Sequence, residues 1–375
     1  MRLIPRLNES MIFKRANLQS QKQQIDLPLF LTTGILVVFG LMMVYDASAI
    51  AGLKDFRDSL YYIRQQLIWV SIGLVSMIFF TGFDYKKFKF LSVPLLFCSV
   101  LLLLAVFIPG LGVSGGGAHR WLRLGMVTIQ PAEIIKLTGV IYLAVLFEKQ
   151  VRLLPFLILV VGVTLITAVL QKDLGSTSVF VATSIIVYLA SGGSIWHFII
   201  SLPIGMLAFL LLVLTSGYRS KRIFALLDPF SDPQGFTYHI SQVLIALGSG
   251  GLFGLGLGHS RQKFEYIPEV STDSIFGIIG EELGFVGGSL VIVLFALFLI
   301  RGCKIAQNCQ DNFGKILALG LTSWLGIQAI VNLSSMTALL PLTGVPLPFI
   351  SYGGSALVAN LTAVGILLNI SKQTT

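Results

Sequence analysis

The chain has 375 residues, 55% of them hydrophobic and only 11% charged, with a mean hydropathy of +0.87 and a net charge of +9. Soluble globular proteins carry roughly 25% charged residues, so this composition excludes an ordinary soluble protein and indicates a polytopic membrane protein. The three cysteines form no CxxC pair and the four histidines are scattered, which argues against a disulfide framework or a zinc site. No Walker A sequence is present, which argues against ATP use, and we expect no nucleic-acid partner.

A membrane-spanning helix needs about 20 apolar residues. Residues 1–27 are polar and basic and lack the features of a signal peptide, so we interpret them as a cytoplasmic tail. The sequence predicts an all-α fold, with about ten transmembrane helices forming a single domain over residues 28–370 and a second short cytoplasmic tail over residues 371–375. The spans that we expect are residues 28–48, 65–83, 90–109, 131–148, 153–170, 176–192, 195–216, 274–300, 316–340 and 350–370, with only a tight turn between the sixth and the seventh.

The distribution of Lys and Arg in short loops sets the orientation of such a protein. A large loop, residues 217–274, separates the seventh and eighth spans, and it is discounted because long segments cross the membrane largely regardless of charge. The remaining Lys and Arg favour a topology with both termini in the cytoplasm. Every motif-like segment then lies on the extracytoplasmic side, where the outer bases suit an anionic substrate.

Carboxylates beside or within an apolar span are costly and are interpreted as functional by default. Asp273 stands where the eighth span begins, and Glu281 and Glu282 lie farther along it. The alternative for Asp273 is a helix N-cap, for which Asp is one of the preferred residues. We expect Glu281 and Glu282 to face protein or a polar cavity and to support the site.

Glycines mark the same region. Gly280, Gly284 and Gly288 repeat every four residues, a pattern that favours close helix packing. In the preceding loop, residues 240–258 are apolar but too short and too rich in glycine to span a membrane. We interpret them as interfacial or re-entrant, which requires that neighbouring protein groups satisfy their backbone.

A second polar group surrounds the start of the fourth span. Arg120 and Arg123 flank a tryptophan, Trp121, after a glycine-rich loop, and this combination suits a phosphate and a sugar face. Glu133 and Lys136 are three residues apart in a helical segment, so they share a face and can pair. The alternatives are an interfacial Trp anchor and a self-neutralising ion pair.

Two further segments interrupt apolar runs. Lys172 and Asp173 suit a polar floor of the same outer cavity, and the alternative is a short turn with a local ion pair. Residues 341–355 contain three prolines and three glycines, which predicts a rigid, non-helical connection between the last two spans. The favoured interpretation of this connection is a structural loop without direct contact to substrate.

Five ordered motifs resemble those of the SEDS family of bacterial cell-wall polymerases, whose members act in shape, elongation, division and sporulation. The resemblance covers about residues 28–370 and is closer to the division members than to the elongation members. The motifs are residues 45–48, 117–136, 171–175, 268–284 and 343–355. The chain departs from the family pattern at Asp46, Ala132, Lys172, Ser271 and Ser274, where the family more often has Ser, Ser, Pro, His and Phe.

The resemblance implies a peptidoglycan glycosyltransferase of the bacterial plasma membrane, acting at the division septum. Its donor would be the glycan on undecaprenyl diphosphate, and its acceptor the GlcNAc 4-hydroxyl of an incoming lipid II. The family's catalytic aspartate maps to Asp273. The implied partners are a class B penicillin-binding protein transpeptidase and other division proteins. A divalent metal, Mg²⁺ or Mn²⁺, is left open as a cofactor.

The chemistry of the residues agrees with this reaction. A sugar hydroxyl is a poor nucleophile, so a carboxylate within hydrogen-bond reach helps as a general base. A leaving diphosphate gathers negative charge, so cations should face it. The expected substrate-binding residues are Arg120, Trp121, Glu133, Lys136, Lys172, Asp173, Arg222, Glu269 and Ser351, with Glu281, Glu282 and Gly284 as supports.

Three other functions remain open at this point: a transporter that flips lipid II, the elongation type of polymerase, and a non-catalytic scaffold that binds a transpeptidase. A transporter should present polar groups to both sides of the membrane. The motifs of this chain gather on the predicted outer side, which favours the enzyme.

Overall fold

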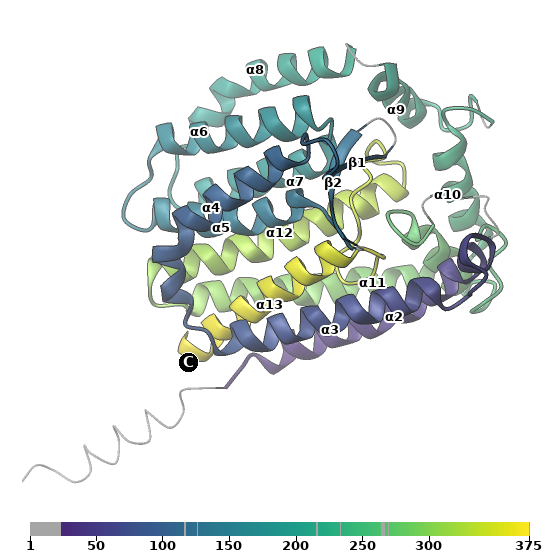
Figure 1. Cartoon of the computed structure of the whole chain (residues 1–375), viewed down its shortest axis with the longest axis horizontal. Coiled ribbons are helices and arrows are strands. Elements are labelled where there is room, and N and C mark those ends of the chain that lie inside the picture. The colour runs from purple at the N-terminus through teal and green to yellow at the C-terminus, as the bar shows by residue number, and fades with distance from the viewer. Residues whose placement is uncertain are drawn as a thin grey trace, which may run out of the picture.

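The structure is a computed structural model that describes residues 24–115, 118–125, 127–214, 217–232, 234–263, 267–268 and 270–374. It is mostly helical, and the long helices run alongside one another as a bundle (Figure 1). The helices are α2 (Leu27–Phe56), α3 (Tyr61–Gly82), the 3-10 turn η1 (Tyr85–Lys87), α4 (Phe88–Ala105), α5 (Pro131–Phe147), α6 (Leu153–Thr164), the π-helical turn η2 (Leu165–Leu170), α7 (Leu174–Ala190), α8 (Ile195–Leu214), α9 (Gly217–Leu227), α10 (Tyr238–Ser249), α11 (Ile275–Asn308), α12 (Asn312–Met336) and α13 (Gly354–Thr374).

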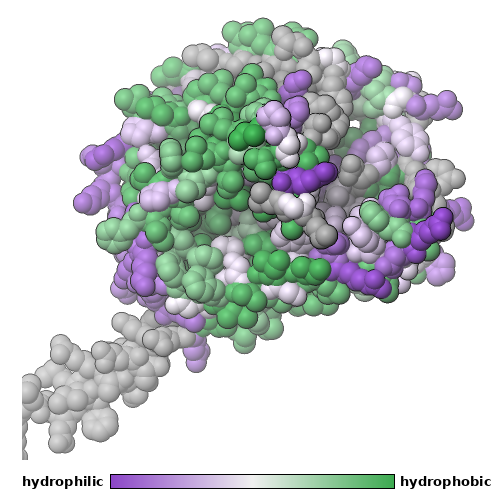
Figure 2. Space-filling view, in the orientation of Figure 1, coloured by the Kyte–Doolittle hydropathy of each residue, from purple (hydrophilic) through white to green (hydrophobic). Residues whose placement is uncertain are grey.

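The ten segments expected to be spans each lie on a helix of this bundle. In the described residues, seven helical segments are long and apolar enough to cross a membrane: Leu27–Phe56, Tyr61–Gly82, Tyr85–Ala105, Leu153–Leu170, Ile275–Asn308, Asn312–Met336 and Gly354–Gln373. Figure 2 shows apolar side chains over the middle of one face and polar side chains at its two ends, as a protein embedded in a bilayer requires. The polytopic membrane fold is therefore confirmed, while the orientation with both termini inside stays a prediction.

The most deeply buried helix is the last one. In α13 the side chains of Leu361, Val364 and Leu368 are almost fully buried. Small residues allow the neighbouring α3 to approach it closely, because a β-carbon on Gly365 would lie 2.5 Å from the carbonyl oxygen of Met77. Van der Waals packing of this kind, with glycine at the contact, is how membrane helices associate.

The segment between α4 and α5 differs from the glycine-rich loop that we expected. It forms a three-stranded antiparallel sheet of β1 (Gly112–Gly115), β2 (Ala118–Leu124) and β3 (Val127–Ile129), with β2 in the middle. The pairing of β1 with β2 shifts register at Arg120, because Val113 pairs with Trp121 and Ser114 with His119. Such a bulge re-aims a side chain. Arg120 is partly buried at this point, whereas Arg123 is exposed.

The long helix α11 is interrupted at Gly284, where φ is 66° and ψ is −164°. The segment 251–256, which follows α10, crosses α11 at this break. Two amides of the segment donate to the carbonyls of Glu281 and Glu282 at 3.0 Å, and two amides of α11 donate back to it at 2.9 and 3.1 Å. These bonds satisfy the backbone of the segment, as the re-entrant interpretation requires. Gly284 itself is a helix break, so its expected role as a helix-packing position was wrong.

Replacing Gly284 with Ala should destabilise the protein. A β-carbon at this position would lie 2.3 Å from the amide nitrogen of Gly254, and the positive φ adds strain on the order of 1–3 kcal/mol. We expect a lower melting temperature in detergent for Gly284→Ala. The matched control is Gly162→Ala on α6, where a β-carbon meets nothing within 4 Å and the melting temperature should hold or rise. Equal melting of the two variants would contradict the role given to the break.

Candidate active site

The candidate active site is organised around the segment 341–353, which joins α12 to α13 and is called here the proline loop. It reaches deep into the bundle, because a β-carbon on Gly40 in the middle of α2 would lie 2.5 Å from the carbonyl oxygen of Phe349. A non-helical backbone at this depth must have its carbonyl groups satisfied by other parts of the protein. The expectation of a rigid, non-helical connection is thus confirmed.

Side chains from other elements supply the missing donors. Three carbonyls of the proline loop, those of Leu342, Val345 and Pro346, accept hydrogen bonds from the side chains of Arg222 on α9 (2.6 Å), Asn332 on α12 (2.8 Å) and Gln328 on α12 (3.2 Å). Within the loop, the Ser351 hydroxyl accepts from the amide of Leu347 at 2.8 Å, and the Ser351 carbonyl accepts from Gln66 on α3 at 3.3 Å. These contacts give Ser351 a structural role, in keeping with the favoured interpretation of this segment.

Asp273 lies in the turn that leads into α11 and is largely buried, with 8% of its surface exposed. The N-cap position of α11 is Ser274, so the interpretation of Asp273 as the cap was wrong. Two hydrogen bonds tie this turn to the proline loop and to α12. The carbonyl of Ser271 accepts from the amide of Tyr352 at 2.7 Å, and the carbonyl of Asp273 accepts from the Asn332 side chain at 2.8 Å.

The Asp273 carboxylate and a guanidinium group both approach the same glycine, Gly344. A β-carbon on Gly344, whose φ is 68°, would lie 3.8 Å from Oδ2 of Asp273 and 4.0 Å from Nη1 of Arg120. A larger residue at this position would therefore contact both groups. The structure brings the predicted base and one predicted cation to the same small volume around Gly344.

Arg120 reaches this volume from β2. Its Nη2 donates to the carbonyl of Lys172 at 3.0 Å, where the backbone of Lys172 has a φ of 59°. Nε of Arg120 and Oγ1 of Thr343 are buried and have no partner among the described residues. Unpaired buried polar atoms are costly, so their presence beside Gly344 suits a site that a polar ligand completes. Lys172 itself keeps an exposed side chain.

Glu133 and Lys136 form a buried ion pair on α5, with Nζ and Oε1 2.7 Å apart. The same ammonium group donates to Gln328 at 2.6 Å and lies over the ring of Trp324. Gln328 in turn holds Pro346, so this pair reaches the proline loop through one side chain. These contacts are those of the alternative interpretation, a self-neutralising ion pair. The pair supports the proline loop through Gln328.

The remaining candidates are spread more widely. Asp173 is the N-cap of α7 and accepts from the amide of Ser176 at 3.1 Å and from Gln130 at 3.3 Å, bonds that favour a structural role. Trp121 is half-buried on β2, next to the bulge at Arg120. Glu269 lies outside the described residues.

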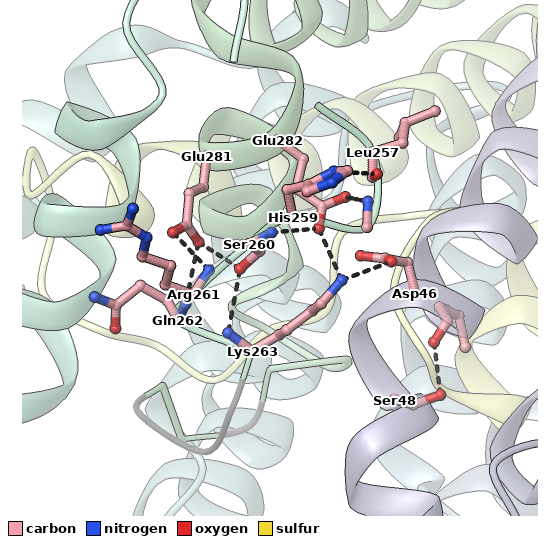
Figure 3. A network of polar contacts seen from close by, with 12 residues as sticks. Asp46, Ser48, Leu257, His259, Ser260, Arg261, Gln262, Lys263, Glu281 and Glu282 are labelled. Carbon is pink, nitrogen blue, oxygen red and sulfur yellow. Dashed lines mark hydrogen bonds and ion pairs between the residues drawn. The ribbon is translucent and has the colours of Figure 1, made fainter. Parts of the chain in front are cut away.

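Glu281 and Glu282 hold the loop that precedes the Asp273 turn (Figure 3). The Glu282 carboxylate accepts from the amides of Gly258 and Ser260, each at 3.0 Å. The Glu281 carboxylate accepts from the amide of Arg261 at 3.0 Å and from the Ser260 hydroxyl. Both side chains are almost fully buried. Both carboxylates therefore hold the backbone of this loop, which agrees with the supporting role predicted for Glu281 and Glu282.

One charged contact in this network was missed from the sequence. Nζ of Lys263 lies 2.9 Å from Oδ1 of Asp46 on α2 and 3.0 Å from Oε1 of Glu282 on α11 (Figure 3). Burial lowers the pKa of Lys263, but the bonds to both carboxylates outweigh it and hold that pKa above its ordinary value. Lys263 therefore ties the first helix to α11. The only signal in the sequence was Asp46, an acidic residue in an apolar span.

His239 on α10 contacts the cap of α11. Its Nε2 lies 2.6 Å from the Ser274 hydroxyl, which itself donates to the carbonyl of Pro268 at 3.2 Å. Burial, followed by the nearby Arg222 cation, lowers the pKa of His239 to about 4. The imidazole is therefore neutral near pH 7, and it holds the start of the helix without adding charge to the site.

In the described residues, no group of three or more His, Cys, Asp or Glu side chains is placed to hold a metal ion. The side chains beside Gly344 are one carboxylate and one guanidinium. A guanidinium group repels a cation, so these described residues do not form a fitted Mg²⁺ or Mn²⁺ site. We derive no step through a metal.

The fold and the site define a polytopic membrane protein with a buried acid–base constellation at one end of its helix bundle. The family model described as cell cycle protein, for FtsW, RodA and SpoVE, matches residues 27–375, and the chain belongs to this family. This confirms the family resemblance stated from the motifs.

Individual relatives agree with the family. The chain is 42% identical to stage V sporulation protein E of Bacillus subtilis, covering 94% of this chain and 98% of the relative. It is 41% identical to the probable peptidoglycan glycosyltransferase FtsW of Trichlorobacter lovleyi, covering 93% of each. The solved RodA of Thermus thermophilus is 27% identical, with a TM-score of 0.68 over 94% of this chain and 98% of that one. A chain of a peptidoglycan synthase complex that coordinates polymerization and crosslinking is 27% identical, with a TM-score of 0.74 over 93% and 98%.

Removing the cation of Lys263 should destabilise the fold. Lys263→Met keeps the length of the side chain but leaves the buried Glu282 without its ion pair, a change that costs about 3–5 kcal/mol. Asp46→Asn should cost roughly 1 kcal/mol, because Asp46 is partly exposed and Asn keeps an oxygen that accepts from Lys263. Thermal unfolding in detergent measures both. The control is Arg64→Met, which removes an exposed ion pair to Asp58 and should leave the melting temperature nearly unchanged.

Stability should fall as the pH drops from 6.5 to 4. Below pH 6.5 the unfolded chain binds a proton at His239, whereas the folded chain does so only below about pH 4. The contribution of neutral His239 is thus complete above pH 6.5 and is lost across this window, on the order of 3 kcal/mol at most. Melting temperatures at pH 7.5, 5.5 and 4 should fall less steeply for His239→Gln than for the wild type. His259→Gln, which changes an exposed histidine, should follow the wild-type profile.

Proposed function

We propose that this chain is a peptidoglycan glycosyltransferase that polymerises lipid II into glycan strands at the outer leaflet of the bacterial plasma membrane. The observation that carries the proposal is the approach of the Asp273 carboxylate and the Arg120 guanidinium to the same glycine, Gly344. A base and a cation close to one another are what a transfer from a diphosphate to a hydroxyl requires. Family membership and the names of the relatives support the same reaction class.

The reaction joins an acceptor hydroxyl to a donor sugar. The 4-hydroxyl of the acceptor GlcNAc attacks the anomeric carbon of the donor glycan, forming the new glycosidic bond. The bond from that carbon to the diphosphate oxygen breaks, and undecaprenyl diphosphate leaves with the electron pair. Asp273 accepts the hydroxyl proton as general base, which suits a carboxylate whose backbone is held by Asn332 and whose Oδ2 lies near Gly344.

The leaving diphosphate gains charge as the bond breaks, so a fixed cation lowers the barrier. Arg120 is the best placed candidate, because its Nη1 lies near Gly344 and its Nε is a buried donor without a described partner. Lys172 is the next candidate, since its carbonyl accepts a hydrogen bond from Arg120 and its side chain is exposed. Arg222 donates to the carbonyl of Leu342 in the proline loop.

The relatives bear on the cellular site of the reaction and on the protein partners. The relatives of 41–42% identity are an FtsW and a sporulation protein, whereas the RodA of known structure is 27% identical. This supports septal synthesis over the elongation type of polymerase. A similar chain lies in a complex that coordinates polymerization and crosslinking, which supports a class B penicillin-binding protein transpeptidase and other division proteins as partners.

The second candidate function is the flipping of lipid II. It predicts polar groups along a path that reaches both ends of the bundle. The unpaired polar atoms near Gly344 instead belong to Arg120 on β2 and to Thr343 in the proline loop, which Arg222 on α9 contacts. The sheet and α9 lie toward the same end of the bundle (Figure 1). The site thus favours the polymerase.

The test uses the purified full chain together with its transpeptidase partner and labelled lipid II. The wild type should form long glycan strands. Asp273→Asn keeps the shape of the side chain but removes the base, so polymer yield should fall at least about 100-fold, the usual scale of general-base catalysis. Asp228→Asn, which changes an exposed residue of the large loop, is the control and should retain activity. Equal polymer from Asp273→Asn and wild type would overturn the role of Asp273, and lipid movement in vesicles without polymer would favour the flippase.

A further inference from the structure

The side chain of Asn332 joins the Asp273 turn to the proline loop near Gly344. The amide nitrogen of Asn332 donates to the carbonyl of Asp273 and to the carbonyl of Val345, both at 2.8 Å. Asp273 carries the base, and Val345 is the neighbour of Gly344. Asn332 therefore connects the acidic turn to the proline loop at the point where the loop passes the carboxylate.

The orientation of this amide follows from its surroundings. Both neighbours are carbonyl oxygens, which only accept hydrogen bonds, so the NH₂ group and not the oxygen of Asn332 must face them. Both amide hydrogens are then used, one on each segment. Asn332 is completely buried near the C-terminal end of α12, a helix packed against α5, α7 and α11, so its side chain has a rigid base.

We propose that Asn332 is a positioning residue for the proposed transfer reaction, setting the distance between the Asp273 carboxylate and the proline loop. The inference rests on the proposed function, since it assigns Asn332 to the same site. Asn332 does not touch the reacting atoms. It acts by fixing the backbone of the base and the backbone beside Gly344 to one planar group, so that the carboxylate keeps one distance from the proline loop.

A second contact differs from that of Asn332 in where it falls. The amide of Tyr352 in the proline loop donates to the carbonyl of Ser271 at 2.7 Å, two residues before the base. The bond from Asn332 falls on the Asp273 carbonyl itself, so it acts directly on the peptide of the base.

The chain offers a matched control for the loss of such an amide. Asn369 on α13 is also buried and also bridges two backbone groups, accepting from the amide of Tyr85 at 3.0 Å and donating to the carbonyl of Thr81 at 3.0 Å. These groups lie at the opposite end of α3 from the site. Asn332→Leu and Asn369→Leu thus each remove two hydrogen bonds to backbone groups. Only Asn332→Leu removes a bond to the turn that carries Asp273.

The experiment measures glycan polymerisation by the full chain with its transpeptidase partner, at several lipid II concentrations, together with the melting temperature of each variant. For Asn332→Leu we expect kcat to fall about 100-fold, because a misplacement near 1 Å has this effect, while KM changes less than about threefold. Asn332→Asp has the same shape but lacks both donors and should lose kcat in the same way. Asn369→Leu should melt at a temperature as low as Asn332→Leu yet keep a kcat near that of the wild type.

Each outcome decides a different point. If Asn332→Leu and Asn369→Leu lose stability alike and both keep their kcat, Asn332 is only structural and the inference is overturned. Equal losses of kcat in both variants would also overturn it, because activity would then follow stability alone. A wild type that forms no polymer overturns the proposed function, and this inference with it. Polymer from the wild type, none from Asp273→Asn and a selective loss of kcat at Asn332 support both.

Discussion

The carbonyl groups of the proline loop impose the constraint on which the rest of the site depends. Prolines cannot donate backbone hydrogen bonds, and no water is available in a bilayer to satisfy a non-helical segment. The loop therefore draws polar side chains from α9 and α12 into an otherwise apolar bundle. One of these side chains, that of Asn332, also donates to the carbonyl of Asp273, so the same group serves the loop and the site.

The carboxylates of this region differ in role because they differ in contacts. Glu281 and Glu282 accept several backbone amides each, which uses their oxygens to hold the loop at residues 258–263. Glu133 is paired with Lys136 inside the bundle. Oδ2 of Asp273 lies near Gly344, as does the guanidinium of Arg120. All of these carboxylates are buried, so burial does not separate their roles. The groups that each carboxylate contacts do.

Much of the fold could be predicted from the sequence because apolar length decides a membrane helix. The turn between α7 and α8 and the re-entrant segment after α10 were visible for the same reason. The sheet at residues 112–129 was missed because short strands rich in glycine resemble loops. The contacts of Lys263 with Asp46, and of Asn332 with Asp273, join residues far apart in the chain, which no local pattern reveals. Gln328 and Asn332, polar residues four apart in one span, were the available signal.

The connectivity of the site also dictates the order in which it is completed during synthesis. The segment 251–256 and the break at Gly284 are close in the chain, so their mutual hydrogen bonds can form as soon as α11 has emerged. The Asp273 turn, by contrast, waits for Asn332 on α12 and for Tyr352 just before α13. A chain that ends between α12 and Tyr352 would keep the bond from Asn332 and lack the bond from Tyr352. Such early termination should therefore yield a membrane-inserted protein without a working site, rather than a shortened enzyme.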